Sequence, residues 1–110
     1  PPYGRDIGKW MERCVHESFE PKFYVGRKST YKDVFCLVFA RTDTKWFHEW
    51  VVPYAHKVFF IKARLQFTNA DGRTGPAPAP SMLVHYNGSN ADPCKFATIS
   101  KDGFHDPHND

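Results

Sequence analysis

Hydrophobic residues near the start of the chain recur at steps of three and four positions. In residues 5–19 these recurring residues are Ile7, Trp10, Met11, Cys14, Val15 and Phe19. This spacing is the period of one face of an α-helix. Pro21 follows and stops the helix. We therefore predict an amphipathic helix over residues 5–19 and a polar, basic loop over residues 21–32.

A continuous apolar run, DVFCLVFA, occupies residues 33–40. Its valine and phenylalanine content is typical of a strand covered on both faces. The next segment, RTDTKWFHEWVVPY, opens with three possible capping residues and then places Phe47, Trp50 and Val51 at helical spacing. Pro53 closes it. We predict a short helix directly after the strand.

Two more strands are predicted after that helix. Residues 57–68, KVFFIKARLQFT, alternate in their second half, and residues 82–86, MLVHY, form another apolar run. The segment between them, NADGRTGPAPAP, is rich in turn-forming residues. Helix, strand, helix, strand and strand in this order predict an α/β fold, in which residues 1–86 form the second half of a doubly wound, Rossmann-like sheet with flanking helices. Residues 87–110 are polar, and we expect a loosely held tail.

Composition excludes some classes of protein and leaves others open. The 110 residues, 41% of them hydrophobic, predict one small domain. The chain shows neither an apolar run of about 18 residues nor a basic-then-apolar leader, so we expect a soluble protein without a membrane partner. Cys14, Cys36 and Cys94 match no zinc or redox spacing and are expected to be buried thiols. His105 and His108 have no third anchored ligand, and we expect no metal.

The first three residues, Pro1, Pro2 and Tyr3, suggest a chemistry for the turn before the first helix. Proline fixes the backbone and leaves a carbonyl oxygen free to accept a hydrogen bond. Acceptors around an exocyclic amine direct its lone pair toward an incoming methyl group. An aromatic ring can stack on a base that is held out of the duplex. On spacing alone, an ordinary structural turn remains the alternative.

Four blocks of the sequence together resemble the phage-type DNA N6-adenine methyltransferases, in that family's order. The blocks are PPYGRDIGKWMERC, LVFARTDTKWFHEWV, VFFIKARLQF and PAPSMLVHY, and ARTDTKWFHEW is the most specific part. The resemblance covers approximately residues 1–86. It implies a Rossmann-like methyltransferase fold, S-adenosylmethionine as cofactor, DNA as partner, and methyl transfer to N6 of adenine by a phage or prophage protein in the bacterial cytoplasm.

The resemblance also implies roles for the first residues. The carbonyl of Pro1 would accept a hydrogen bond from the adenine amine, Pro2 would shape the loop, and Tyr3 would stack on the extruded adenine. In the family an Asp or Asn precedes Pro-Pro-Tyr, and an upstream half helps to hold the cofactor. We therefore expect this chain to be the C-terminal part of such an enzyme, with little activity by itself. Ala63 departs from the family, which usually has glycine at that position.

Further candidate contacts to substrate or DNA lie after the predicted strand over residues 33–40 and, in one case, within the predicted strand over residues 57–68. They are Arg41, Thr42, Asp43, Thr44, Lys45 and Arg64. Residues after a strand of an open α/β sheet commonly face the ligand. Their alternative is a structural one, in which Thr42 or Asp43 only caps the helix and Arg41 is solvated.

Trp46 and the remaining basic residues also have two interpretations. Trp46 either stacks on a base or the adenine of the cofactor, or packs in the core. Arg27, Lys28 and Lys32, with Lys45 and Arg64, either contact phosphates or are solvated charges. Two other function classes stay open: a non-catalytic DNA-binding module derived from a methyltransferase, and a small α/β interaction protein whose proline-rich residues 76–80 bind partners.

Overall fold

The computed structural model describes residues 4–19, 33–88 and 94–100. It also gives the backbone of three short strands, β1 (Phe23–Tyr24), β2 (Arg27–Lys28) and β9 (Gly103–His105). The expectations for Pro1, Pro2, Tyr3, Lys32 and His108 lie outside the described residues. So do those that concern the side chains of Arg27, Lys28 and His105.

The first helix, α1, spans Ile7–Phe19 and confirms the amphipathic pattern. Met11 and Val15 are buried on the face that the periodicity selects. Ser18 is buried as well, and its hydroxyl donates to the carbonyl of Val15 at 2.9 Å. This hydrogen bond matters because an unsatisfied buried hydroxyl costs about 1–3 kcal/mol. The helix thus places its apolar side and one satisfied polar group against the sheet.

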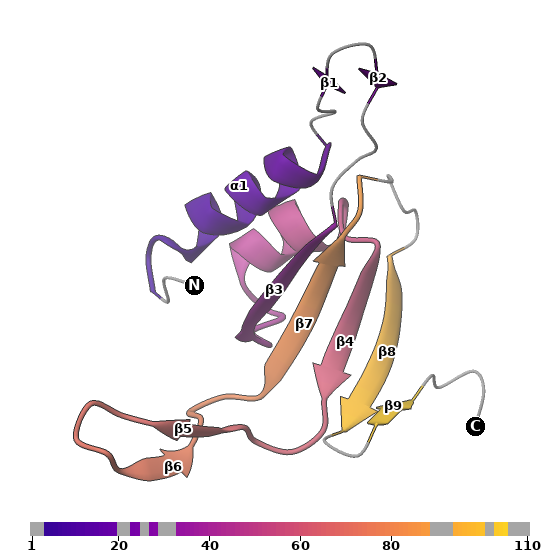
Figure 1. Ribbon diagram of the computed structural model, residues 1–110. Helices are drawn as coiled ribbons and strands as arrows, with labels where there is room; N and C mark the ends of the chain where they lie inside the picture. The colour runs from indigo at the N-terminus through magenta and orange to yellow at the C-terminus, as the bar shows by residue number, and fades with distance from the viewer. Residues whose placement is uncertain are drawn as a thin grey trace.

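The central sheet has five strands in the order β3-β7-β4-β8-β9 (Figure 1). They are β3 (Val34–Phe39), β7 (Ser81–Tyr86), β4 (Lys57–Ile61), β8 (Lys95–Ser100) and β9. Strand β7 is antiparallel to both of its neighbours, whereas β4 and β8 are parallel. Consequently β3, β4 and β8 run in one direction, and their carboxyl ends meet at the same edge of the sheet. The molecule is therefore a mixed α/β structure with a mixed sheet.

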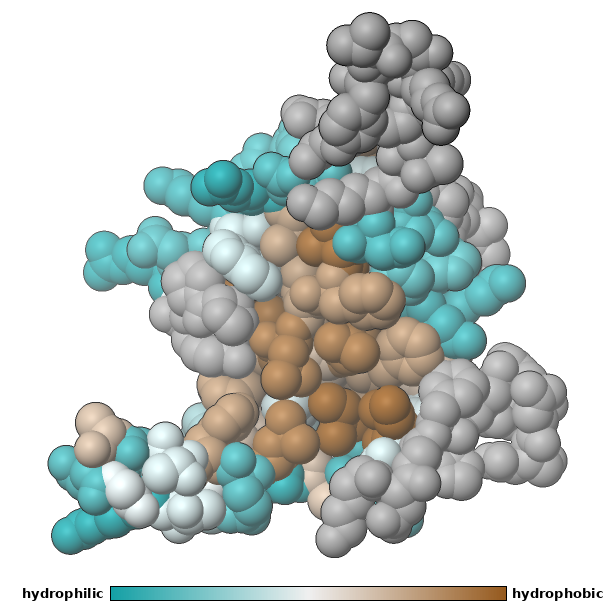
Figure 2. Space-filling model, viewed as in Figure 1, coloured by the Kyte–Doolittle hydropathy of each residue, from teal (hydrophilic) through white to brown (hydrophobic). Residues whose placement is uncertain are grey.

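Helical segments cover one face of this sheet in the described part of the chain. Val38, Val58 and Val84 point to that face and are fully buried or nearly so, in one cluster with residues of α1. Phe35 and Leu37 alternate to the other face, where they are 57% and 38% exposed. Figure 2 shows apolar residues gathered over the strands on this open face. The expectation that residues 33–40 are covered on both faces is not met within the described ranges.

The second helical segment, η1, spans Phe47–Val51 and is a short π-helix, in agreement with the short helix expected after β3. The amide of Val52 donates to the carbonyl of Phe47 at 3.0 Å, which is the five-residue step of a π turn. Phe47 and Val51 are both buried. Trp50 is held through its backbone, because the Tyr86 hydroxyl donates to its carbonyl at 2.5 Å. The apolar spacing thus located the segment correctly and did not indicate its π-helical form.

The predicted strand over residues 57–68 is two strands, β4 and β5 (Gln66–Thr68). Between them Ala63 has a φ of 66°, the left-handed region that L residues rarely adopt. The chain turns there, and β5 pairs with β6 (Thr74–Pro76) in a separate antiparallel hairpin. Figure 1 shows this β5–β6 hairpin extending away from the sheet. A pattern of alternating residues does not reveal such a break, because the alternation resumes after it.

The expectation of a loose tail after residue 87 was wrong for part of that segment. Strand β8 pairs with β4 over five positions, and β9 pairs with β8. Cys94 and Ala97 are 7% and 1% exposed. The polar composition concealed this strand, because most of the β8 side chains are exposed or half-buried and only Ala97 is fully covered.

Candidate functional site

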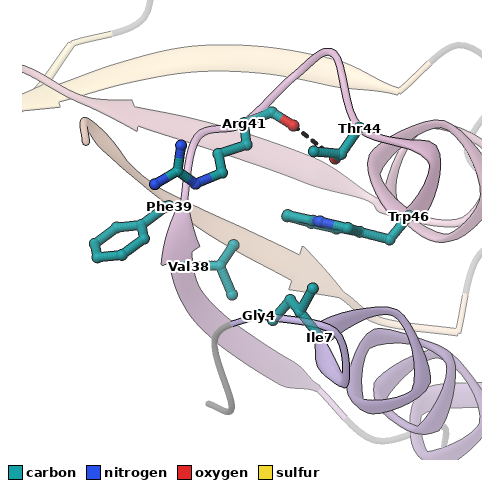
Figure 3. Close-up of a pocket in the computed structure, with 7 residues that line it drawn as sticks. All are labelled: Gly4, Ile7, Val38, Phe39, Arg41, Thr44 and Trp46. Atoms are coloured by element: carbon teal, nitrogen blue, oxygen red, sulfur yellow. Dashed lines mark hydrogen bonds between the residues drawn. The ribbon is translucent and has the colours of Figure 1, made fainter. Parts of the chain in front are cut away.

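A pocket of about 380 Å³ opens between the start of α1 and the end of β3 (Figure 3). We call it the β3-end pocket. Its lining residues are Gly4, Ile7, Val38, Phe39, Arg41, Thr44 and Trp46. The pocket lies at the carboxyl edge of the parallel strands, where open α/β sheets bind their ligands. Its volume is within the usual range for small-molecule sites, which begins near 300 Å³.

Aromatic and aliphatic groups form most of the pocket wall. Figure 3 shows the indole of Trp46 extending into the pocket, with Thr44 on one side and Ile7 on the other. The guanidinium carbon of Arg41 lies 5.6 Å from the centroid of the Phe39 ring. An exposed cation–π contact of this kind contributes about 0.5–1 kcal/mol. The pocket therefore combines a flat ring, an apolar floor and one cation at its mouth.

The turn after β3 positions Arg41 through local hydrogen bonds. The Thr44 hydroxyl donates to the Arg41 carbonyl at 2.7 Å, drawn as the dashed line in Figure 3. The Nε2–H of His48 donates to the carbonyl of Thr42 at 2.9 Å. At the other side of the turn, the amide of Ala40 donates to the Pro80 carbonyl at 2.7 Å. These bonds engage backbone groups and do not involve the Arg41 guanidinium, which lies over the Phe39 ring at the edge of the pocket.

The structure separates the five residues that the sequence placed together after β3. Arg41 and Thr44 line the β3-end pocket, whereas Thr42, Asp43 and Lys45 are exposed and are not among its lining residues. Lys45 pairs with Glu49 at 3.5 Å on the surface, a contact of little energetic weight. Neither Thr42 nor Asp43 caps η1, whose N-cap position is Trp46 without a side-chain cap bond.

Trp46 packs on the core, as one of its two interpretations predicted, and also lines the β3-end pocket. It is half-buried, contacts the ring of Phe47 edge-on at 6.4 Å between centroids, and packs on the core. One part of its indole nevertheless lines the pocket. A residue fixed by the core on one side offers a rigid surface on the other, which suits stacking on a flat ligand.

Arg64 has a structural contact that the sequence did not indicate. Its Nη1 donates to the carbonyl of Ala77 at 3.1 Å, thirteen residues further along the chain. This bond joins the two ends of the β5–β6 hairpin. Arg64 lies outside the lining of the β3-end pocket, so a role there has no geometric support.

The cysteine and tyrosine side chains with shifted pKa values are buried and lie outside the lining of the β3-end pocket. The three cysteines are buried free thiols, as expected. Burial raises the pKa of Cys94 to about 11 and raises the pKa of Tyr86 beyond its usual range. The Cys36 thiol donates to Cys14, which lowers the pKa of Cys14 and raises that of Cys36. These shifts reflect core packing rather than a reactive group in the pocket.

A second polar cluster at the opposite edge of the sheet was missed by the sequence reasoning. His85 Nε2 lies 2.9 Å from Asp33 Oδ1, a pair 52 residues apart in the chain. The His85 ring stacks on Phe35 at 4.2 Å, and the His56 ring lies 5.3 Å away. Burial and the neighbouring His85 lower the pKa of His56. The pairing of β3 with β7 brings His85 beside Phe35 and Asp33. No local sequence pattern indicates this cluster.

Comparison of the chain with protein-family models, with curated proteins and with solved structures gave no match. In the ranges that the structure describes, no three histidine, cysteine or carboxylate residues gather in a way that could hold a metal ion. Within the same ranges, no helix has both the length and the apolar content needed to cross a bilayer. The β3-end pocket is thus the feature from which a function is argued.

Proposed function

We propose that the chain takes part in methyl transfer from S-adenosylmethionine to N6 of adenine in DNA, with the β3-end pocket holding the extruded base. The observation that carries this proposal is the position of Gly4 and Trp46 in one pocket. Gly4 directly follows Tyr3 in the sequence, so a residue of the block that by resemblance carries the catalytic loop lines the same pocket as the Trp46 indole. Two separate blocks of the resemblance therefore converge on one site.

The wall of the pocket suits a purine base. Trp46 supplies a ring for stacking, which stabilises an extruded base by about 1–3 kcal/mol. Ile7 and Val38 give an apolar floor that excludes water from the base. Arg41 at the mouth suits a phosphate of the flipped nucleotide. Together these residues hold and orient the base, which is the part of the reaction that positioning accelerates most.

The same lining does not fit the cofactor. S-adenosylmethionine would supply the methyl group as an electrophilic carbon on a sulfonium, and its ribose hydroxyls call for hydrogen-bond acceptors such as a carboxylate. The residues that line the β3-end pocket include no carboxylate. We therefore assign no described residue to the cofactor and derive no step through it.

Ala63 gives independent support to the resemblance. Among the described residues it is the one non-glycine residue with positive φ. A backbone that needs φ > 0 favours glycine, which is the residue that the family usually has there. Ala63 is the one clear substitution within the matching blocks, and its positive φ explains why the family usually has glycine at this position.

A non-catalytic DNA-binding module is the second candidate, because the pocket has features for a base and no carboxylate for the cofactor. The third class, an interaction protein that uses residues 76–80, has less support. Ala77 and Ala79 are 3% and 5% exposed. Pro80 also accepts a hydrogen bond from Ala40 at 2.7 Å. The prolines of this segment remain exposed, but its alternate residues are fixed to its own domain, and no observation singles out a partner for it.

The product of the reaction tests the proposal. The natural protein that carries this chain is incubated with adenine-containing, unmethylated DNA and methyl-labelled S-adenosylmethionine, and the modified bases are identified by mass spectrometry. We expect label in N6-methyladenine. Tyr3→Ala should lower the rate strongly, while Tyr3→Phe should keep much of it, because the ring face performs the stacking. Bound DNA without any methylated base would favour the non-catalytic module, and label in cytosine would contradict the proposal.

A further inference from the structure

The β5–β6 hairpin is the most exposed regular element in the described part of the chain. Its strand residues are exposed except for Gly75, which is half-buried. It leaves the sheet at the carboxyl edge, the same edge that carries the β3-end pocket (Figure 1). We propose that this hairpin is an arm that grips duplex DNA beside the pocket; the identity of the partner rests on the proposed function.

Two hydrogen bonds close the base of the arm, and a third joins the segment after it to the body of the protein. The amide of Ala77 donates to the Leu65 carbonyl at 2.8 Å, and Arg64 donates to the Ala77 carbonyl at 3.1 Å. Pro80, just after the arm, accepts from Ala40 at 2.7 Å. Ala40 immediately precedes the pocket residue Arg41. The Ala40–Pro80 bond therefore holds the segment that follows the arm beside the turn that carries the pocket residue Arg41.

A row of side chains connects the arm to the pocket. The Phe67 ring of β5 lies edge-on to the Phe39 ring, with 6.5 Å between centroids. Phe39 lines the β3-end pocket, and the Arg41 guanidinium sits over its ring. Phe67 remains 42% exposed. A continuous surface of two rings and one cation thus runs from the hairpin to the place where the base would enter.

The tip of the arm is ordered by one side chain. Asn69 Oδ1 accepts from the amides of Asp71 and Arg73 at 3.1 and 3.0 Å. The Gly72 amide donates to the Asn69 carbonyl at 3.0 Å, and Gly72 has a φ of 79°. An isolated two-stranded hairpin is marginal in water, so these bonds matter for its shape. They hold the backbone of Arg73 and leave its side chain exposed.

The charge of the arm matches a polyanion. Residues 62–80 contain three basic residues, Lys62, Arg64 and Arg73, and one acidic residue, Asp71. Lys62 and Arg73 are exposed, and none of the ion pairs among the described residues involves Arg73. A shallow groove of about 300 Å³ lies along Phe67, Arg73 and Gly75. Basic side chains on a two-stranded ribbon suit the phosphates that border the major groove, which is wide enough to admit such a ribbon.

The salt dependence of DNA binding tests the arm. Affinity for a short fluorescein-labelled duplex is measured by anisotropy between about 50 and 200 mM salt, for the parent protein, Arg73→Gln and Lys95→Gln. Arg73→Gln keeps the backbone bonds to Asn69 and removes one exposed charge. Lys95 is the matched control, since it is exposed at the start of β8, on the opposite edge of the sheet. A thermal melt of each variant shows that the fold is retained.

We expect Arg73→Gln to weaken binding several-fold at low salt and to reduce the slope of log affinity against log salt by about 0.9, the contribution of one phosphate contact. Lys95→Gln should leave the slope unchanged. Equal slopes of log affinity against log salt for all three proteins would overturn the proposal that the hairpin grips DNA. The methylation assay tests the proposed function separately. Binding to polyglutamate as tight as binding to the duplex, with the same loss in Arg73→Gln, would also overturn the proposal for the hairpin, because the surface would then be a general polyanion site.

Discussion

Trp46 shows how one residue can serve both the core and the site. Its helical spacing with Phe47 and Trp50 predicted core packing, which is found, and part of its indole also lines the β3-end pocket. Thr42 and Asp43 were expected to face the site because they follow a strand, and they lie outside the pocket lining. The difference is which side of a four-residue turn faces the end of β3. Sequence spacing places a residue near a site, whereas the direction of its side chain depends on turn geometry.

Cys94 allows a test of burial at a single residue. Its thiol has a pKa raised from 9.0 to about 11 by burial. A raised folded-state pKa means that the folded protein keeps this proton where the unfolded chain loses it. The stability that Cys94 contributes is therefore complete below pH 9 and is lost as the pH rises toward 11.

We expect Cys94→Ala to reduce this alkaline loss of stability, measured as the free energy of unfolding in urea across the same pH range. Tyr86 and Cys36 also have raised pKa values and remain in the variant, so a smaller decline should persist. An identical decline in the parent and the variant would show that the Cys94 thiol is not buried as described.

At the scale of elements, periodicity located those whose burial follows a regular pattern. The helix α1 and the strand β3 appear within two residues of their predicted bounds. The same reasoning joined β4 to β5 and missed β8, because neither the turn at Ala63 nor the edge pairing with β4 leaves a hydrophobic signature. Of the residues that line the β3-end pocket, the sequence singled out Arg41, Thr44 and Trp46 as candidate contacts; Gly4 and Ile7 come from the turn before α1 and from α1 itself.

The break between β4 and β5 predicts a stabilising substitution. Ala63 has a φ of 66°, and the left-handed conformation costs an L residue about 1–2 kcal/mol. Glycine avoids that strain and loses about 0.5–1 kcal/mol in backbone entropy on folding. Ala63→Gly should therefore raise the free energy of unfolding by about 0.5–1 kcal/mol.

Ala70→Gly is the matched control, because Ala70 is an exposed alanine without a positive φ, in the tip of the same hairpin. It should lower the free energy of unfolding slightly. Urea denaturation of both variants measures these changes in the free energy of unfolding. If Ala63→Gly and Ala70→Gly shift the midpoint equally in the same direction, the left-handed turn is not a strained feature of this fold.

At the scale of the whole molecule, the direction of the strands assembles the site. Because β3, β4 and β8 run the same way, the turn that carries Arg41 and the arm that follows β4 emerge at one edge. The pairing of His85 with Asp33 at the other edge depends on the same register. Strand order and register are set by contacts between distant segments, so composition and periodicity could indicate an α/β fold without the arrangement of its sheet.

Photo-crosslinking can test directly whether the β3-end pocket receives an extruded adenine, as proposed above. Duplexes that carry a photoreactive 8-azidoadenine at single positions are bound to the natural protein and irradiated, and the attached peptide is identified by mass spectrometry. We expect attachment within the peptides that contain Gly4–Ile7 or Arg41–Trp46, which supply most of the pocket lining. In Trp46→Ala, attachment to the peptide that contains residues 41–46 should be lost. Attachment confined to peptides outside this lining, unchanged in Trp46→Ala, would contradict the proposal.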